Sequence, residues 1–159
     1  ITIRDLIKTA LRMRPDRILI GEVRGSEAID LLQALNTGHD GSISTGHANS
    51  PVDMLSRLET MVLMGMEIPI QAIRRQIASG IDIMVHLGRL RDKSRKVLEI
   101  LEILGYDSST GEIRTQSLFQ FREQGVDSWG NIQGSLVRTA ELSGVQKLQR
   151  AGYVPRGAV

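Results

Sequence analysis

The first eighty residues alternate short apolar runs with amphipathic segments, and this alternation constrains the fold more than any other feature. Residues 17–21 and 41–45 are short runs next to glycine, and each predicts a strand. Apolar residues at helical spacing predict helices before, between and after these strands. Strands that alternate with helices favour a parallel sheet with helices on its faces. The predicted fold class is therefore α/β.

The predicted helices carry recognisable end signals in the sequence. The first and the fourth helix are expected over residues 2–13 and 69–79. The expected N-terminal signals are the capping box Thr2/Asp5, the cap Ser26, and Ser50 with Pro51 at the first helical position. The expected C-terminal signals are Pro15, Gly38 and Gly80.

After residue 80 the pattern changes to strands with short connections, which favours antiparallel pairing. The expected strands cover 82–87, 96–104, 112–121 and 132–137. A turn is expected at 107–111, a loop at 125–134 and a closing helix at 141–150. Residues 152–159 are expected to fray.

Composition excludes several classes of protein. With 41% hydrophobic and 24% charged residues, the chain resembles an ordinary soluble globular protein. Its net charge of +2 is too balanced to indicate nucleic-acid binding, and the absence of cysteine excludes disulfides and thiolate metal sites. No apolar run approaches the roughly 20 residues of a membrane span. No signal peptide precedes the first predicted helix. Because the chain starts with Ile1 rather than Met and the helix follows at once, we expect it to begin inside a longer gene product.

Two further groups of residues have an ordinary and a functional interpretation. A basic run could touch anionic lipid or an acidic partner, but a solvated hairpin turn is the favoured interpretation. Its members are Arg89, Arg91, Lys93, Arg95 and Lys96. Four methionines on or after the third helix could contact a moving partner, with core filling as the default. These are Met54, Met61, Met64 and Met66.

The acid Glu22 follows the predicted strand 17–21 after a single glycine. At such a strand end, a carboxylate can order a magnesium-bound water or polarise an attacking one. The ordinary alternative is a loop acid paired with Arg24 or Arg17. A phosphate site also needs a loop of the form G-x-x-x-x-G-K-[ST], and the 159 residues contain none. The sequence thus predicts the carboxylate of a nucleotide site without the phosphate loop that would complete it.

His47 follows the second predicted strand within the segment 42–50, S-I-S-T-G-H-A-N-S. In open α/β sheets, ligands bind at such strand ends, where His47 could donate to a γ-phosphate oxygen. The alternative is a loop histidine bonded to the backbone. Metal ligation is not expected, because His39, His47 and His86 lack an i, i+4 pairing and cysteine companions.

Together, LRMRPDRILIGEVRGSEA and TGHDGSISTGHANSP closely resemble the secretion superfamily of hexameric ATPases, the type II/IV secretion system ATPases. Among them the segments are most similar to the CpaF-like branch, which assembles tight-adherence (Flp) pili. The resemblance is clear over residues 1–105 and weaker over the tail. It implies the C-terminal part of a RecA-like P-loop ATPase core over 1–105, with an antiparallel strand and helix extension over 106–159.

The resemblance also implies roles for individual residues. Glu22 matches the Walker B glutamate, which would hold Mg²⁺ through water, and His47 matches the histidine-box residue. Gly21 sits where many other P-loop enzymes carry Asp, and Thr45 accompanies the histidine. Arg14 and Arg24 match family arginines near the nucleotide, and either could face a neighbouring subunit or form a surface ion pair.

In this family the phosphate loop and the acidic Asp box precede the segment that matches this chain, so the chain alone is expected to be inactive. The implied cofactors are ATP and Mg²⁺. The implied assembly is a homo-oligomer, usually a hexameric ring, with heterologous contacts. It would work in the cytoplasm, peripheral at the bacterial inner membrane, against secretion or pilus platform proteins.

Two alternatives belong to other functional classes. A non-catalytic module could keep the fold for oligomerisation or docking alone, without hydrolysing nucleotide. A nucleic-acid motor with a RecA core is disfavoured by the near-neutral charge and the 3% aromatic content. A phosphate loop encoded upstream would favour the motor, and its absence would favour the docking module.

Overall fold

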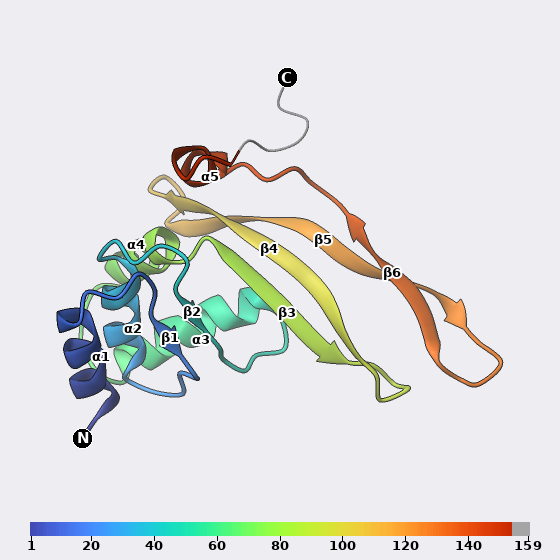
Figure 1. Cartoon of the computed structure of the whole chain (residues 1–159), viewed down its shortest axis with the longest axis horizontal. Coiled ribbons are helices and arrows are strands. Elements are labelled where there is room, and N and C mark those ends of the chain that lie inside the picture. The colour runs from blue at the N-terminus through green and yellow to red at the C-terminus, as the bar shows by residue number, and fades with distance from the viewer. Residues whose placement is uncertain (154–159) are drawn as a thin grey trace. The chain divides into compact units, whose positions relative to one another are not determined.

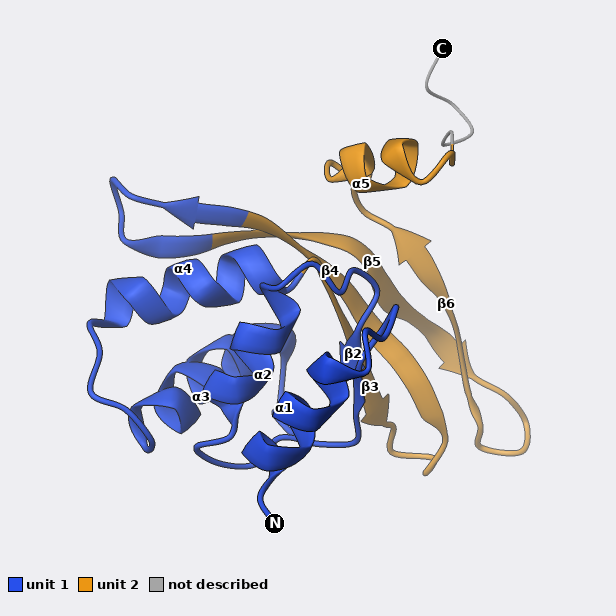
Figure 2. Ribbon diagram, turned by 60° about the vertical axis from the view of Figure 1, so that its left-hand side comes forward, with its two compact units in different colours: residues 1–81, 105–113 blue, residues 82–104, 114–159 orange. Residues whose placement is uncertain are grey.

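The computed structural model describes residues 1–153 and divides the chain into two compact units (Figure 2). Unit 1 comprises residues 1–81 and 105–113, and unit 2 comprises 82–104 and the chain from 114 onward. Most of the expected frayed segment, residues 154–159, lies outside the described part. The expected division at residue 105 refers to the family's architecture and stays a prediction.

Unit 1 contains a short parallel sheet among four helices (Figure 1). Its elements are α1 (Ile3–Arg12), β1 (Leu19–Ile20), α2 (Ala28–Leu35), β2 (Ile43–Ser44), α3 (Pro51–Leu63) and α4 (Ile70–Gly80). The pairing of β1 with β2 is parallel, in the register Leu19 with Ile43. The predicted parallel sheet and the α/β class are thus confirmed. Both strands are shorter than predicted. Just before β1, Ile18 N donates to the Ser42 side-chain hydroxyl at 2.9 Å and not to a backbone carbonyl of the neighbouring strand, so the ladder does not extend there.

Local side-chain signals set several of the helix boundaries. The predicted capping box is present, with Asp5 N donating to Thr2 Oγ1 at 3.2 Å and Thr2 N donating to Asp5 Oδ2 at 2.9 Å. Ser50 caps α3 as predicted, accepting from Asp53 N at 3.0 Å. The prediction for Ser26 was wrong, because Glu27 occupies the N-cap position of α2.

Helix α2 forms the centre of unit 1 and contacts α1, α3 and α4 (Figure 2). Its buried residues pack against apolar side chains of α3 and α4 that are also buried. The buried apolar residues of these helices are Ala28, Ile29, Leu31, Leu32, Ala34, Leu55, Leu58, Met61, Val62, Ile73 and Ile77. A second cluster joins Ile7 of α1 to Ile18 and Ala34. This helical layer holds the loops that follow β1 and β2.

Arg74 of α4 ties together three segments of unit 1. Its Nε donates to Glu59 of α3 at 2.8 Å, and its Nη1 donates to the Gly111 carbonyl and to Glu112, both at 2.8 Å. Gly111 belongs to the turn predicted at 107–111, which is confirmed, and Glu112 begins the strand that follows it. A half-buried arginine with three donated contacts to fixed acceptors holds its neighbours more firmly than an exposed ion pair does.

Unit 2 is built on an antiparallel sheet of order β3-β4-β5-β6. The strands are β3 (Ile83–Arg89), β4 (Arg95–Asp107), β5 (Glu112–Val126) and β6 (Ile132–Arg138). The turn between β4 and β5 belongs to unit 1. Antiparallel pairing was predicted and is confirmed. The expected loop at 125–134 was too long, because β5 continues to Val126 and pairs there with Ile132.

The basic run forms the turn between β3 and β4, as the hairpin interpretation predicted. Leu90 N donates to the Ser94 carbonyl at 2.8 Å, and Arg91 pairs with Glu123 on β5. Asp92 Oδ2 accepts from Ile132 N at 2.7 Å. The charge of Arg91 is therefore balanced by a carboxylate within the same sheet.

The closing helix α5 (Val145–Arg150) is shorter than the predicted 141–150. The residues before it adopt a loop that is bonded to Glu102 of β4, a carboxylate only 3% exposed. Gly144 N donates to Glu102 Oε1 at 2.6 Å, and Ser143 N donates to the same carboxylate at 3.0 Å. These long-range bonds replace the first helical turn that the sequence predicted.

Candidate functional site

Glu22 and His47 follow two adjacent parallel strands, β1 and β2, on the same side of the pair. The pairing continues past the strand ends, where Val23 N donates to the Thr45 carbonyl at 3.1 Å. The Thr45 hydroxyl donates to the Gly21 carbonyl across the same gap. Parallel strands bring their carboxyl ends to one edge, so the two predicted segments meet there.

The Glu22 carboxylate lies between two nitrogen-bearing side chains. Arg24 Nη2 is 2.7 Å from Oε2, and His47 Nε2 is 2.8 Å from Oε1. The ion pair with Arg24, expected as the ordinary alternative, therefore forms together with the contact to His47. The ring of His47 contacts a carboxylate and not the backbone, so the structural alternative for this residue was wrong.

The site favours the ionised form of Glu22. The hydrogen bond and the charge of Arg24, with a smaller contribution from His47, lower the pKa of Glu22 and outweigh the opposing effect of burial. Oε1 is buried and has no hydrogen bond of normal geometry among the described residues, in spite of its short distance from His47. A charged oxygen with accepting capacity left over suits a general base or an acceptor for a bound water.

Glu27 shapes the loop that carries Arg24, and the sequence did not reveal this role. Its Oε1 accepts from Arg24 N at 2.7 Å and from Gly25 N at 3.1 Å. The loop also packs closely on the end of α3, where a Cβ on Gly65 would lie 2.7 Å from the Ser26 side chain. Only glycine allows this approach without a shift of the loop.

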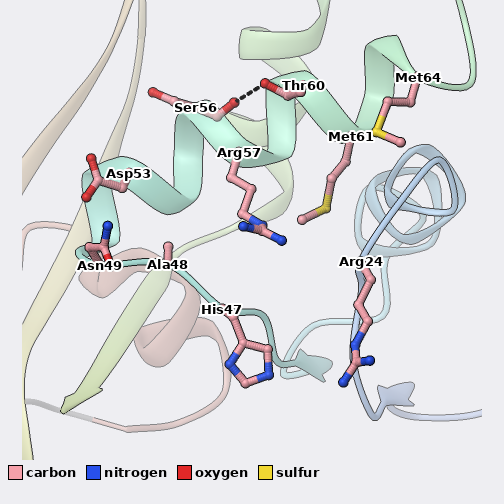
Figure 3. Close-up of a pocket in the computed structure, with 10 residues that line it drawn as sticks. All are labelled: Arg24, His47, Ala48, Asn49, Asp53, Ser56, Arg57, Thr60, Met61 and Met64. Carbon is pink, nitrogen blue, oxygen red and sulfur yellow. Dashed lines mark hydrogen bonds between the residues drawn. The ribbon is translucent and has the colours of Figure 1, made fainter. Parts of the chain in front are cut away.

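An open cavity of about 590 Å³ is lined by Arg24 and His47, the two residues that contact Glu22 (Figure 3). Arg24 and His47 contribute one part of its wall, and the face of α3 contributes most of the rest. Ten residues line it: Arg24, His47, Ala48, Asn49, Asp53, Ser56, Arg57, Thr60, Met61 and Met64. All of them belong to unit 1. Arg57 and Asn49 were not predicted as site residues, although the cap Ser50 places α3 directly after the histidine segment.

The remaining predicted site residues have different positions. Gly21 is exposed, and a Cβ there would meet nothing within 4 Å. Arg14 is exposed, adopts a positive φ of 52° after α1, and is not among the residues that line the cavity. Of the methionines, Met61 is 2% exposed and fills the core as predicted, whereas Met64 is 68% exposed.

Glu22 could contribute to binding a metal ion, but most of the ligands of that ion would have to come from a nucleotide and from water. No cluster of three His, Cys, Asp or Glu able to bind a metal occurs in residues 1–153. A single carboxylate with one free acceptor oxygen fits Mg²⁺ through a water, since Mg²⁺ keeps several waters beside a nucleotide. Within the same part of the chain, no helix has the length and apolar character needed to cross a bilayer.

Comparison with known proteins places these features in a family. Residues 1–149 match the family model described as type II/IV secretion system protein. A putative conjugal transfer protein of Mycobacterium tuberculosis strain H37Rv is 45% identical over 100 residues, which cover 63% of this chain and 28% of that protein. The type IV secretion system protein PtlH of Bordetella pertussis is 42% identical over 101 residues, 60% of this chain and 30% of that protein.

A solved structure agrees with the fold. The crystal structure of the VirB11 ATPase from the Brucella suis type IV secretion system, in complex with sulphate, matches with a TM-score of 0.60 and 36% identity. The match covers 63% of this chain and 31% of that one. The chain thus spans about 28–31% of the length of these relatives. It belongs to the type II/IV secretion system protein family, and its relatives include a VirB11 secretion ATPase.

Proposed function

We propose that this chain is the Walker B and histidine-box part of an ATP-hydrolysing motor for protein secretion or pilus assembly. The observation that supports it is the Glu22 carboxylate, held ionised between Arg24 and His47 at the joined ends of β1 and β2. The family membership and the ATPase among its relatives support the same reaction. The proposed branch is CpaF-like, and the proposed assembly is a hexameric ring at the inner membrane.

In this proposal each residue has a distinct task. Glu22 accepts a proton from, or orients, the water that attacks the terminal phosphate, and its charge is the essential property. Bound Mg²⁺ would neutralise charge on the phosphates, with Glu22 reaching it through water. His47 donates to a γ-phosphate oxygen, and Arg24 keeps Glu22 charged. Thr45 and Gly21 hold the two segments in register by their mutual hydrogen bond.

Replacement of Glu22 by Gln in the full-length protein tests the proposal. Gln keeps the size of the side chain but removes its charge, so ATP binding should persist while hydrolysis falls by about two to three orders of magnitude. Glu22→Asp should lie between, because the charge is retained but misplaced by about 1 Å. Steady-state phosphate release measures the effect.

Glu67→Gln provides the matched control, since Glu67 is exposed in the loop after α3. It should leave turnover unchanged. Near-normal turnover of Glu22→Gln would reduce Glu22 to a structural ion-pair partner of Arg24. A second candidate function is a docking module without hydrolysis. Wild-type protein that neither binds nor hydrolyses ATP would support that module.

A further inference from the structure

Three nitrogen-bearing side chains point into the cavity from its two walls (Figure 3). Arg24 and His47 come from the loops after β1 and β2, and both already contact Glu22. Arg57 comes from the middle of α3 and extends toward the space between the other two. The cavity is therefore lined by one guanidinium that Glu22 neutralises and by a second one that it does not.

Arg57 has no ion-pair partner among residues 1–153. Asp53, one turn earlier on α3, is at the i, i+4 spacing that usually gives a helical ion pair. No such pair forms, although both residues line the cavity, and Arg57 extends toward the space between Arg24 and His47 in Figure 3. In the described part of the chain, Arg74 pairs with Glu59 and Arg91 with Glu123. Arg57, by contrast, is exposed and, like Arg12 and Arg114, has no ion pair within that part. The unpaired guanidinium thus faces the cavity while a nearby carboxylate is left unused.

The walls beside Arg57 favour a bound anion. Met61, 2% exposed, and the Met64 side chain form an apolar border next to the guanidinium. Met64 is 68% exposed and the cavity is open, so the match with an anion is one of charge and shape: the planar guanidinium fork fits the oxygens of a phosphate. The polar part of the same wall is formed by the hydroxyl-bearing Ser56 and Thr60 and by Asn49.

We propose that Arg57 is a further catalytic residue that binds the terminal phosphate of ATP from the side opposite Glu22 and Arg24. The inference rests on the proposed function, because it assigns to that site a residue on α3. It also explains why α3 begins directly after the histidine segment: the Ser50 cap fixes the helix so that Arg57, two turns further on, reaches the phosphate that His47 contacts.

The test compares the affinities of full-length protein for a non-hydrolysable ATP analogue and for ADP. Arg57→Gln should weaken binding of the analogue by about 10- to 100-fold, the range for loss of a hydrogen bond to a charged group. Binding of ADP, which lacks the terminal phosphate, should not change. Arg57→Lys should recover part of the difference, because Lys keeps the charge but not the fork.

Arg114→Gln is the matched control, since Arg114 is exposed on β5 in unit 2 and its loss should change neither affinity. An equal loss for both ligands in Arg57→Gln and Arg57→Lys would show a structural role and overturn the proposal, as would unchanged affinities. Altered ring assembly by sedimentation with an unchanged preference for ATP over ADP would assign Arg57 to an acidic partner surface instead. A further outcome is that Glu22→Gln loses hydrolysis while Arg57→Gln keeps the wild-type preference for the ATP analogue over ADP. This result would overturn the inference on Arg57 and leave the proposed function standing.

Discussion

At the scale of single residues, the site depends on one carboxylate with two competing environments. Burial alone would raise the pKa of Glu22, whereas Arg24 lowers it by more, through a hydrogen bond at 2.7 Å and through its charge. The net direction is downward, so Glu22 is ionised over a wider acidic range than a free side chain. An ion pair that looks ordinary on the surface can therefore maintain the charge that catalysis needs.

Removal of Arg24 should move the acidic limb of the pH profile. In Arg24→Gln the largest cause of the lowered pKa is lost while the effect of burial remains, so the pKa of Glu22 rises. Because the proposed mechanism requires the ionised form of Glu22, kcat/KM of the full-length variant should begin to fall at a higher pH than in wild type. Arg12→Gln, a change at an exposed arginine at the end of α1, should leave the limb in place. An unmoved limb in Arg24→Gln would refute the role assigned to Arg24.

At the scale of elements, α5 and the loop before it depend on a buried carboxylate rather than on helix propensity. Burial raises the pKa of Glu102, but hydrogen bonds from Ser143, Gln116 and Gly144 outweigh it and lower the pKa overall. Gln116 Nε2 donates to Glu102 at 2.6 Å, and Lys147 of α5 separately pairs with Asp82 at 2.8 Å. The end of the described chain is thus attached to the sheet of unit 2 by polar contacts.

We expect Glu102→Gln to loosen this attachment. The amide nitrogen of Gln would face at least one N–H donor, leaving buried groups unsatisfied at a cost of about 1–3 kcal/mol. Hydrogen exchange at the amides of Ser143 and Gly144 in the full-length protein should accelerate by about 10- to 100-fold. Glu99→Gln on the same strand is the control and should change these amides little. Unchanged protection in Glu102→Gln would show that other contacts hold the loop.

The Glu102 contacts also have a defined pH dependence. Since the pKa of Glu102 is lowered in the folded protein, its contribution to stability is complete above the pKa of the unfolded chain. That contribution is lost as the pH falls through the folded-state pKa. The attachment of α5 should accordingly weaken only in acid, which the same exchange experiment can follow as a pH series.

At the scale of the whole molecule, the chain carries the side chains proposed to act in hydrolysis but no phosphate loop within its 159 residues. Backbone amides and the lysine of such a loop provide most of the grip on a triphosphate. We therefore predict that the isolated 159-residue chain binds ATP weakly or not at all. A titration with a fluorescent ATP analogue and Mg²⁺ tests this, after circular dichroism has verified that the isolated chain is folded. Micromolar affinity would contradict the prediction.

Local chemistry explains which parts of the fold the sequence alone determined. The capping box at Thr2 and Asp5, the cap at Ser50 and the alternation of strand and helix depend on neighbours within a few residues. The sequence likewise placed Glu22 and His47 at strand ends, because a strand that stops at glycine exposes the residue that follows.

Only the tertiary structure decided which of these side chains meet and which contacts replace the local signals. Glu27 and not Ser26 stands at the N-cap position of α2, and its carboxylate binds the amides of Arg24 and Gly25 in the preceding loop, a geometry that spacing does not encode. Arg57 lines the cavity together with Arg24 and His47, because the packing of α3 in unit 1 brings that face of the helix beside the loops after β1 and β2. Glu102 binds residues 41 and 42 positions further along the chain, at Ser143 and Gly144. Contacts over such distances depend on how elements pack in three dimensions, which a pattern of neighbouring residues cannot specify.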